Sequence, residues 1–369
     1  MDFDMDTVSE IISRGWSTGL HIGVGGEGGI GGQMTDFPDD FHVDEVEAYS
    51  PCGSGEHVYL RIRKRGMNTM DVVRILGRIF DVPERDIGYA GLKDKHAVTS
   101  QWFSIRYHGD FGEVSGDFSG YEGMEVVEVS RHGNKLRTGH LRGNRFGIVL
   151  EGVTGDDAGI LSRCSDLSEH GFVNYYGKQR FGIDGGNVSS GIDILRGTGK
   201  RMSQQSQRFC ISALQSAVFN LECHLRVSEH DGEVFEGDVL QKTGGGCFVC
   251  EDAAVDRLRA AAGEVFVTGL LPGSKAMTGF GYSYELERDC SRRFGISWEE
   301  RDRVVGGDLL DFGVLKRFGA GSRRVIRERV GDLVFHRLGV DRIRVEFFLP
   351  SGSYATVFLR ELCGYGFNR

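Results

Sequence analysis

Apolar and polar residues alternate with a period of two in several short segments of the chain. Successive side chains of a β-strand point to opposite faces, so this alternation is typical of a strand with one buried face. On this basis we predict strands at residues 41–46, 57–63, 124–129, 342–349 and 354–359. An apolar run through Trp102 and Phe103 predicts a further strand.

Two other segments show the helical period. Residues 68–80 begin with a residue suited to a helix N-cap, keep apolar side chains on one helical face and end before Pro83. Residues 204–227 form a longer helical pattern, which is followed by short glycine-rich pieces and by "EERDRVVGGDLLDF" (299–312). Clear strand patterns return at the end of the chain.

This order of strands and helices predicts an α+β fold with a second domain inserted into the first. We assign residues 1–169 and 328–369 to the first domain and residues 170–327 to the insertion. The chain has 369 residues, of which 40% are hydrophobic, and this is enough to bury two cores.

No segment of the sequence suggests contact with a membrane. The apolar runs fall short of the roughly 18 residues that a transmembrane helix needs. The acidic start "MDFDMDTVSE" lacks the apolar core of a secretory signal. We therefore expect a cytoplasmic protein, or a nuclear one if the host is eukaryotic.

Eight cysteines are scattered along the chain and do not have the spacing of a disulfide framework. Cys247 and Cys250 are the one close pair. A structural zinc site needs a second pair of cysteine or histidine ligands, and the sequence shows none at ligand spacing. We expect small core residues here and no metal, with a zinc-bearing RNA-binding protein as an alternative.

The net charge of −9 does not favour a nucleic-acid partner, because phosphates bind where the local potential is positive. Two local segments differ from this average. Residues 131–150 contain no acidic residue and five cationic ones, namely Arg131, Lys135, Arg137, Arg142 and Arg145. Residues 61–65 add Arg61, Arg63, Lys64 and Arg65. Each segment is either a solvated surface or one side of a groove that binds phosphates.

Asp94 is the most distinctive candidate for chemistry. It lies between Lys93 and Lys95, after a glycine-flanked turn and before the apolar run that includes Trp102. The two cations favour the ionised carboxylate, whereas burial opposes it. An ionised carboxylate in a basic rim can act as a nucleophile or a base; the other interpretation is a charged turn before a strand.

The segment around this aspartate, "AGLKDKHAVTSQW" (90–102), strongly resembles the catalytic motif of the TruD family of pseudouridine synthases. Six further segments resemble blocks of the same family, in the same order along the chain. They are "PDDFHVDE" (38–45), "GSGEHVYLRIRKRGMNT" (53–69), "KLRTGHLRGNRF" (135–146), "NYYGKQRFG" (174–182), "SAVFN" (216–220) and "LPSGSYATVFLREL" (349–362). The resemblance covers most of the chain outside its glycine-rich beginning and parts of the insertion.

The resemblance implies a pseudouridine-synthase catalytic domain on a mixed, mostly antiparallel sheet, interrupted by an α+β insertion domain specific to the family. It implies conversion of uridine to pseudouridine in tRNA, at position 13, without a cofactor. The family's indispensable carboxylate matches Asp94. The family's Asn that organises the active site matches Asn144, and the Phe that stacks on the target base matches Phe146. Phe41 matches the Phe that lines the same pocket.

The basic residues then have a role. We expect nine of them to line an RNA cleft between the two domains: Lys93, Lys95, Arg131, Lys135, Arg137, Arg142, Arg145, Lys178 and Arg180. The partner that the resemblance implies is tRNA, with other RNAs as further candidates, and the family suggests a monomer. The alternative is a non-catalytic RNA-binding protein or tRNA chaperone on the same scaffold.

Two positions depart from the family pattern. Thr35 stands where the family commonly has a lysine or arginine that can pair with the catalytic aspartate. Either another cation, such as Lys93 or an arginine, takes over that role, or the activity is altered. Tyr176 stands where the family often has phenylalanine, and we expect little consequence because base stacking is assigned to Phe146.

Overall fold

The computed structural model describes residues 29–109, 111–113, 115–296, 319–364 and 367. They divide into two compact units. Glu27–Gly171 with Arg329–Arg369, described from residue 29 onward, is called the sheet unit; Phe172–Glu328 is called the helical unit. That these units are a catalytic domain and an inserted domain stays a prediction, and "EERDRVVGGDLLDF" lies outside the described residues.

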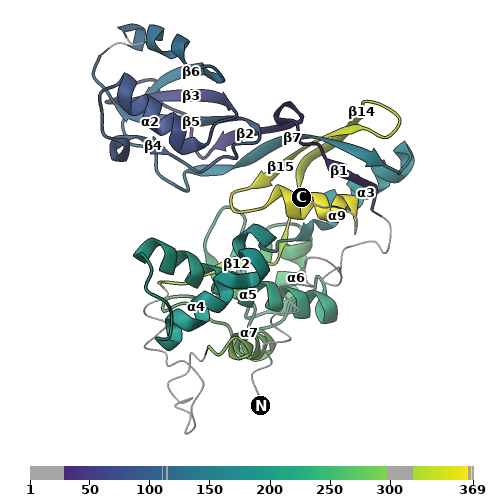
Figure 1. Ribbon diagram of the computed structural model, residues 1–369. Helices are drawn as coiled ribbons and strands as arrows, with labels where there is room; N and C mark the ends of the chain where they lie inside the picture. The colour runs from purple at the N-terminus through teal and green to yellow at the C-terminus, as the bar shows by residue number, and fades with distance from the viewer. Residues whose placement is uncertain (1–28, 110, 114, 297–318, 365–366, 368–369) are drawn as a thin grey trace. The chain divides into compact units, whose positions relative to one another are not determined.

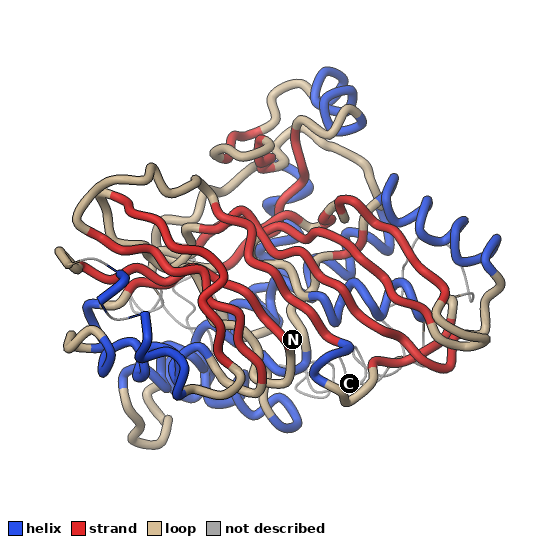
Figure 2. The backbone as a smooth tube through the Cα atoms, turned by 90° about the horizontal axis from the view of Figure 1, so that it is seen from above, coloured by secondary structure: helices blue, strands red, loops and turns tan. Residues whose placement is uncertain are grey.

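A nine-stranded sheet forms the sheet unit (Figures 1 and 2). Its main path runs β14-β15-β7-β2-β5-β3-β6, with β1 paired to β7 and β4 paired to β5. Only β2 and β5 run parallel among these pairs, so the sheet is mixed and mostly antiparallel, as the sequence predicts. The strands are β1 (Gly31–Met34), β2 (Phe41–Glu47), β3 (His57–Arg65), β4 (Gly88–Tyr89), β5 (Val98–Arg106), β6 (Met124–His132), β7 (Leu141–Val153), β14 (Gly331–Arg337) and β15 (Ile343–Pro350).

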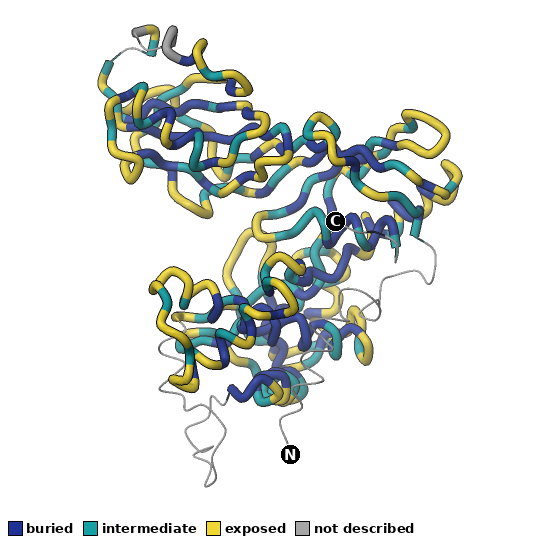
Figure 3. The backbone as a smooth tube through the Cα atoms, in the orientation of Figure 1, coloured by how far each residue is buried: buried dark blue, intermediate teal, exposed yellow. Residues whose placement is uncertain are grey.

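Helices cover two parts of one face of this sheet. On α2 (Thr69–Ile79), the predicted helix, Asn68 and Asp71 form a capping box that satisfies backbone groups at the helix start. Its apolar side packs on β3 and β5, in a core that is buried along the strands (Figure 3). On α9 (Ala355–Cys363), Phe358 packs on Phe347 of β15 with ring centroids 4.4 Å apart. The unit also has α3 (Asp157–His170) and four 3-10 helices, η1 (Pro38–Asp40), η2 (Glu84–Asp86), η3 (Phe111–Glu113) and η4 (Ser115–Gly120).

The predicted strand at residues 354–359 is wrong, because this segment begins helix α9. A short apolar run fits a buried strand and a buried helix equally well. Both edges of β15 are already paired, with β7 on one side and β14 on the other. The chain therefore cannot add a strand beside β15, and it turns to cover the face of the sheet instead. The other predicted strands are confirmed as β2, β3, β5, β6 and β15.

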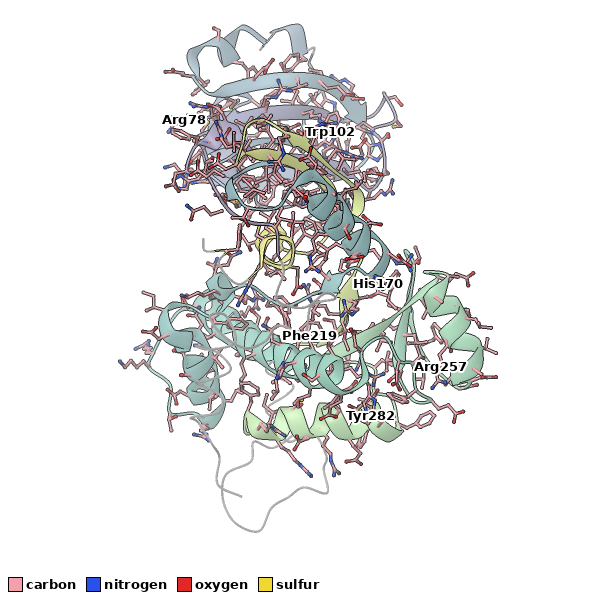
Figure 4. The ribbon with its side chains drawn as sticks, turned by 90° about the vertical axis from the view of Figure 1, so that its right-hand side faces the viewer. Arg78, Trp102, His170, Phe219, Arg257 and Tyr282 are labelled. Atoms are coloured by element: carbon pink, nitrogen blue, oxygen red, sulfur yellow. The ribbon has the colours of Figure 1, made fainter. Side chains whose placement is uncertain are left out.

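The helical unit is organised around α5 (Gln204–His230), which confirms the predicted long helix. Phe219 lies on α5 and Tyr282 on α7 (Gly281–Arg293), as Figure 4 shows. A four-stranded sheet of order β10-β9-β11-β12 and a β8/β13 pair complete the unit. Its remaining elements are β8 (Phe172–Val173), η5 (Lys178–Arg180), η6 (Ile183–Gly185), α4 (Gly186–Arg196), β9 (Val239–Lys242), β10 (Cys247–Val249), α6 (Ala253–Ala261), β11 (Val265–Leu271), β12 (Ser322–Val325) and β13 (Arg327–Glu328). Among the described residues of both units, no helix is long and apolar enough to cross a membrane.

Candidate active site

Three predicted site residues meet on one face of the sheet, in the gap between the parts that α2 and α9 cover. The register of β2 and β7 places Asn144 beside Glu45 and Phe146 beside Val43. Residues two apart on a strand share a face, so Phe41 belongs to the same surface as Glu45. The sheet therefore brings Phe41 together with Asn144 and Phe146, which lie about a hundred residues later in the chain.

Phe146 is the middle ring of an aromatic stack. Its ring lies 5.1 Å from that of Phe347 and 6.5 Å from that of Phe41, with an interplanar angle of 20° in both pairs. Aromatic pairs in proteins have centroids about 4.5–7 Å apart, so the contact with Phe347 is close and the contact with Phe41 is near the upper limit. The ring separation is therefore larger on the side of Phe146 that faces Phe41, which we call the looser side of the stack.

Lys93 is buried, and its ammonium group bridges two side chains of the sheet. Nζ lies 2.9 Å from Oε2 of Glu45 and donates a hydrogen bond of 2.6 Å to Oδ1 of Asn144. The side chains of Lys93 and Glu45 are 5% and 1% exposed. The ammonium is therefore directed into the protein and compensated there, which does not fit the predicted contact with an RNA phosphate.

Glu45, which contacts Lys93, lies where one edge of β5 changes its pairing partner from β2 to β4. One edge of β5 pairs with β3, where Trp102 is opposite Arg61; the other edge pairs with β2 up to Ser100 and with β4 from Phe103, which leaves no paired strand residue opposite Trp102 on that edge. The backbone N–H of Trp102 donates to Oε1 of Glu45 at 3.2 Å. The same carboxylate thus replaces a missing strand carbonyl and neutralises Lys93.

Asp94 lies at the surface, on a turn that is fixed from several sides. Its Oδ1 accepts a hydrogen bond of 3.0 Å from the backbone N–H of His96, and the residue is exposed. The backbone N–H of the preceding Lys93 donates to Oγ1 of Thr69, the first residue of α2, at 2.8 Å. Because the side chain of Lys93 bonds to Asn144, the residue before Asp94 is linked to the strand position two residues from Phe146.

Lys64 belongs to the basic segment that the sequence predicts to be a solvated surface or one side of a phosphate-binding groove, and for this residue both predictions are wrong. It is fully buried, and its Nζ donates to the main-chain oxygens of Met67 at 2.6 Å and of Asp94 at 2.8 Å. Burial lowers the pKa of Lys64 to about 8, while the negative charge of Asp94 opposes that shift. The alternation in β3 contains the signal, since Lys64 shares the apolar face of Leu60 and Ile62.

The predicted RNA-binding residues of the sheet unit have different surroundings. Lys95, Arg137 and Arg142 are exposed. Arg142 is the extra residue of a β-bulge in β7, a feature that redirects a side chain. Lys135 donates to the main-chain oxygen of Arg85. These four residues stay candidates for contact with RNA.

Arg131 and Arg145 are less well placed for that role. The guanidinium of Arg131 donates to the main-chain oxygens of Gly55, Tyr107 and Gly109, at 3.3, 3.0 and 2.6 Å. Arg145 lies between Asn144 and Phe146 in sequence and therefore faces the other side of β7, where it pairs with Asp332 at 2.9 Å. The structure does not bring Arg145 together with the stacking residue.

Lys178 and Arg180 belong to the helical unit. Lys178 is exposed, whereas Arg180 donates to the hydroxyl oxygen of Ser212 at 2.8 Å. Tyr176 has Arg180 and Arg324 over its ring, 5.6 and 4.2 Å from the centroid. Tyr176 is thus part of a cation–π cluster in this unit.

Thr35 does not take part in the site around Asp94. Its hydroxyl donates to Oδ2 of Asp40 at 2.8 Å. Lys64 and Lys93 are the buried cations of the described residues around Asp94, and Glu45 compensates the second of them.

Cys247 lies on β10 and Cys250 follows that strand. Burial raises the pKa of the Cys250 thiol to about 12, and this disfavours the thiolate that binds a metal. Within the described parts of the chain, no group of three or more His, Cys, Asp or Glu side chains could hold a metal ion.

Comparison with known proteins decides the family. The family model described as tRNA pseudouridine synthase D (TruD) matches residues 18–199 and 187–362. The chain belongs to the TruD family. A TruD relative from Anaeromyxobacter sp. (strain Fw109-5), named tRNA pseudouridine synthase D, is 40% identical over 348 residues, covering 92% of this chain and 94% of the relative. A TruD relative of the same name from Thermus thermophilus is 37% identical over 337 residues, covering 90% of this chain and 89% of the relative.

A solved structure supports the TruD fold. The crystal structure of a protein described as tRNA pseudouridine synthase D (TruD) from Methanosarcina mazei superposes with a TM-score of 0.73, over 97% of this chain and 98% of that one. The two sequences are 20% identical, so this likeness bears on the fold alone. The α+β fold predicted for a TruD protein is confirmed.

Proposed function

We propose that this protein isomerises a uridine of tRNA to pseudouridine, with Asp94 as the catalytic carboxylate. Membership of the TruD family supports the activity and makes the non-catalytic alternative unfavourable. The observation that supports the role of Asp94 is its placement: an exposed carboxylate on a turn whose neighbour, Lys93, is bonded to Asn144 beside the aromatic stack.

The reaction needs a carboxylate and a flat apolar surface. The N1–C1′ bond breaks, the uracil turns over, a C5–C1′ bond forms, and the C5 proton is lost as N1 gains one. The atoms therefore balance without a redox partner. Asp94 can attack C1′ or C6, or remove a proton from the sugar; the placement of Asp94 is compatible with each of these routes.

The aromatic stack supports the next part of the proposal. Phe146 holds the detached uracil flat, and Phe41 lines the same pocket on the looser side of the stack. To reach Asp94 the nucleotide must leave its own stack, which costs a few kcal/mol that contacts to flanking phosphates offset. Lys95, Arg137 and Arg142 are exposed cations suited to such contacts.

We further propose that the target is position 13 of tRNA and that the protein acts as a monomer in the cytoplasm. The first statement rests on the family resemblance. Sequencing of pseudouridine sites after incubation with total tRNA tests it, and light scattering on the purified protein tests the oligomeric state. Modification confined to another position contradicts the assignment.

The variant Asp94→Asn separates an enzyme from an RNA-binding scaffold. We expect no pseudouridine and unchanged affinity for tRNA, because the amide keeps the shape of the side chain and loses its nucleophilic oxygen. Asp44→Asn is the matched control, since Asp44 is an exposed aspartate on the opposite face of β2 from Glu45. Product formation by Asp94→Asn at the wild-type rate sinks the catalytic assignment.

A further inference from the structure

Lys64 is a buried lysine in an unusual setting. It sits on the apolar face of β3, yet within the described residues no carboxylate lies within ion-pairing distance of its Nζ. Removing an ammonium group from water without a counter-ion is costly, so such a residue is a candidate for a functional role. Its hydrogen bonds indicate what that role is.

The two acceptors of Lys64 belong to different parts of the site. One is the main-chain oxygen of Met67, in the connection between β3 and α2, and the other is the main-chain oxygen of Asp94 itself. The ammonium group thus joins the start of α2 to the turn that carries the carboxylate. The hydroxyl of Thr69 makes a parallel link by accepting from the backbone N–H of Lys93.

The charge of Lys64 also differs from that of Lys93. Glu45 neutralises Lys93 at 2.9 Å, whereas the positive charge of Lys64 is compensated only over a longer range. The charged groups that act on it are the carboxylates of Asp94 and Asp71, which favour its protonated form, and Lys93, which disfavours it. Asp94 exerts the largest of these effects.

We propose that Lys64 is a positioning residue for the isomerase reaction, which fixes the backbone of Asp94 through its main-chain oxygen and places a buried positive charge behind the turn that carries the carboxylate. This proposal rests on the proposed function. It also accounts for Thr35, which stands where the family commonly has a lysine or arginine. In this protein, the cation next to Asp94 is Lys64 on β3, so no cation is needed in the segment before η1.

The first test replaces Lys64 by methionine, which has a similar length and no charge. Because a small displacement of a reacting group costs about a hundredfold in rate, we expect kcat in Lys64→Met to fall by about that factor. The KM for tRNA changes by less than about threefold, because Lys64 does not touch the RNA. Lys64→Arg restores much of the rate, and Lys200→Met, at an exposed lysine of the helical unit outside the proposed site, is the control.

The second test compares the pH profile of the wild-type protein with that of Lys64→Arg, which keeps a positive charge at this position. Deprotonation of Lys64 removes the charge, and its pKa is lowered to about 8. Single-turnover rates of the wild-type protein therefore fall above about pH 8, and this decline is absent from Lys64→Arg, whose guanidinium stays charged. Affinity for tRNA over the same pH range checks that binding is intact.

Each outcome decides a separate question. Wild-type kcat in folded Lys64→Met overturns the proposal, and so does an alkaline decline that is the same in wild type and Lys64→Arg. If Lys64→Met does not fold, the comparison of pH profiles decides. An active Asp94→Asn removes the catalytic assignment of Asp94 whatever Lys64 does, whereas an inactive Asp94→Asn with a normal Lys64→Met removes this inference alone.

Discussion

The ammonium of Lys93 lies 2.9 Å from the carboxylate of Glu45, and both side chains are almost completely buried. Glu45 comes from a strand of the candidate site, and Lys93 directly precedes Asp94 on its turn. A buried pair of this kind adds little net stability compared with apolar residues, but losing one partner leaves an uncompensated charge in the interior. The pair therefore constrains where the turn that carries Asp94 can lie.

We predict that Glu45→Gln lowers the free energy of unfolding by about 3–5 kcal/mol, because Lys93 keeps its charge without a counter-ion. Chemical denaturation measures the loss. Glu125→Gln is the matched control, since Glu125 forms an exposed ion pair with Arg63 at 3.0 Å and such pairs contribute about 0–1 kcal/mol. The double variant Glu45→Gln with Lys93→Met recovers most of the stability. A single-variant loss below that of the control contradicts the prediction.

Phe146 and Phe347 allow a comparison between the proposed base-stacking ring and a neighbouring ring for which no contact with the base is proposed. Both lie in one stack, 5.1 Å apart. We predict that Phe146→Leu lowers the single-turnover rate by about 10- to 100-fold, since leucine keeps apolar bulk but offers no flat surface to the uracil. Phe347→Leu has a melting temperature similar to that of Phe146→Leu. It lowers the single-turnover rate much less than Phe146→Leu does. Equal rates in the two variants contradict the base-stacking role.

Arg137 and Arg142 are exposed, whereas Arg131 donates hydrogen bonds to main-chain oxygens. We predict that Arg137→Ala and Arg142→Ala weaken tRNA binding without lowering the melting temperature, because both side chains are exposed. Each lost phosphate contact reduces the slope of log affinity against log salt by about 1. Arg131→Ala lowers the melting temperature instead, because it removes donors to three main-chain oxygens. The opposite pattern excludes Arg137 and Arg142 from the RNA interface.

Two buried carboxyl groups make the helical unit sensitive to pH. Burial, together with the nearby Glu287 carboxylate, raises the pKa of Glu222 well above its ordinary value of 4.5. Burial also raises the pKa of Glu287, but its pairing with Arg323 at 2.6 Å opposes that shift, so we assign the proton that the folded pair binds to Glu222. The folded protein binds this proton more tightly than the unfolded chain, so the stabilising contribution is complete below about pH 4.5 and is lost as the pH rises through the folded pKa.

We therefore predict that Glu222→Gln stabilises the protein at pH 8 by about 1 kcal/mol or more, and has little effect at pH 5. The amide oxygen can still accept the hydrogen bond from the backbone N–H of Leu270, which is 2.8 Å in the wild type. Melting temperatures from pH 5 to pH 9 measure the difference. A constant difference between variant and wild type across this range shows that Glu222 does not titrate.

Much of this protein can be predicted from its sequence, since local patterns have local causes. The alternation at residues 41–46 and 57–63 fixes β2 and β3, because a period of two suits a strand that is buried on one side. The cap at Asn68 and Pro83 bracket α2 for equally local reasons. The motif around Asp94 identifies the family, and with it the candidate carboxylate.

Other features depend on contacts between distant parts of the chain. The segment at residues 354–359 is a helix because β7 and β14 already occupy the edges of β15. Glu45, Lys93 and Asn144 meet because β2 and β7 pair in one particular register. Arg145 faces away from Phe146 for the same reason. Charge and spacing alone do not contain this information.

The sequence by itself determined the family and the type of fold, and it supplied the candidate carboxylate, because short motifs and periodic patterns suffice for them. The tertiary structure alone decided which cations lie near the turn that carries it. Lys93 and Lys95 flank Asp94 in sequence, yet one is neutralised inside the sheet by Glu45 and the other is exposed. The cation on its main-chain oxygen is Lys64, thirty residues earlier, because strand pairing and burial determine which charges are near one another in space.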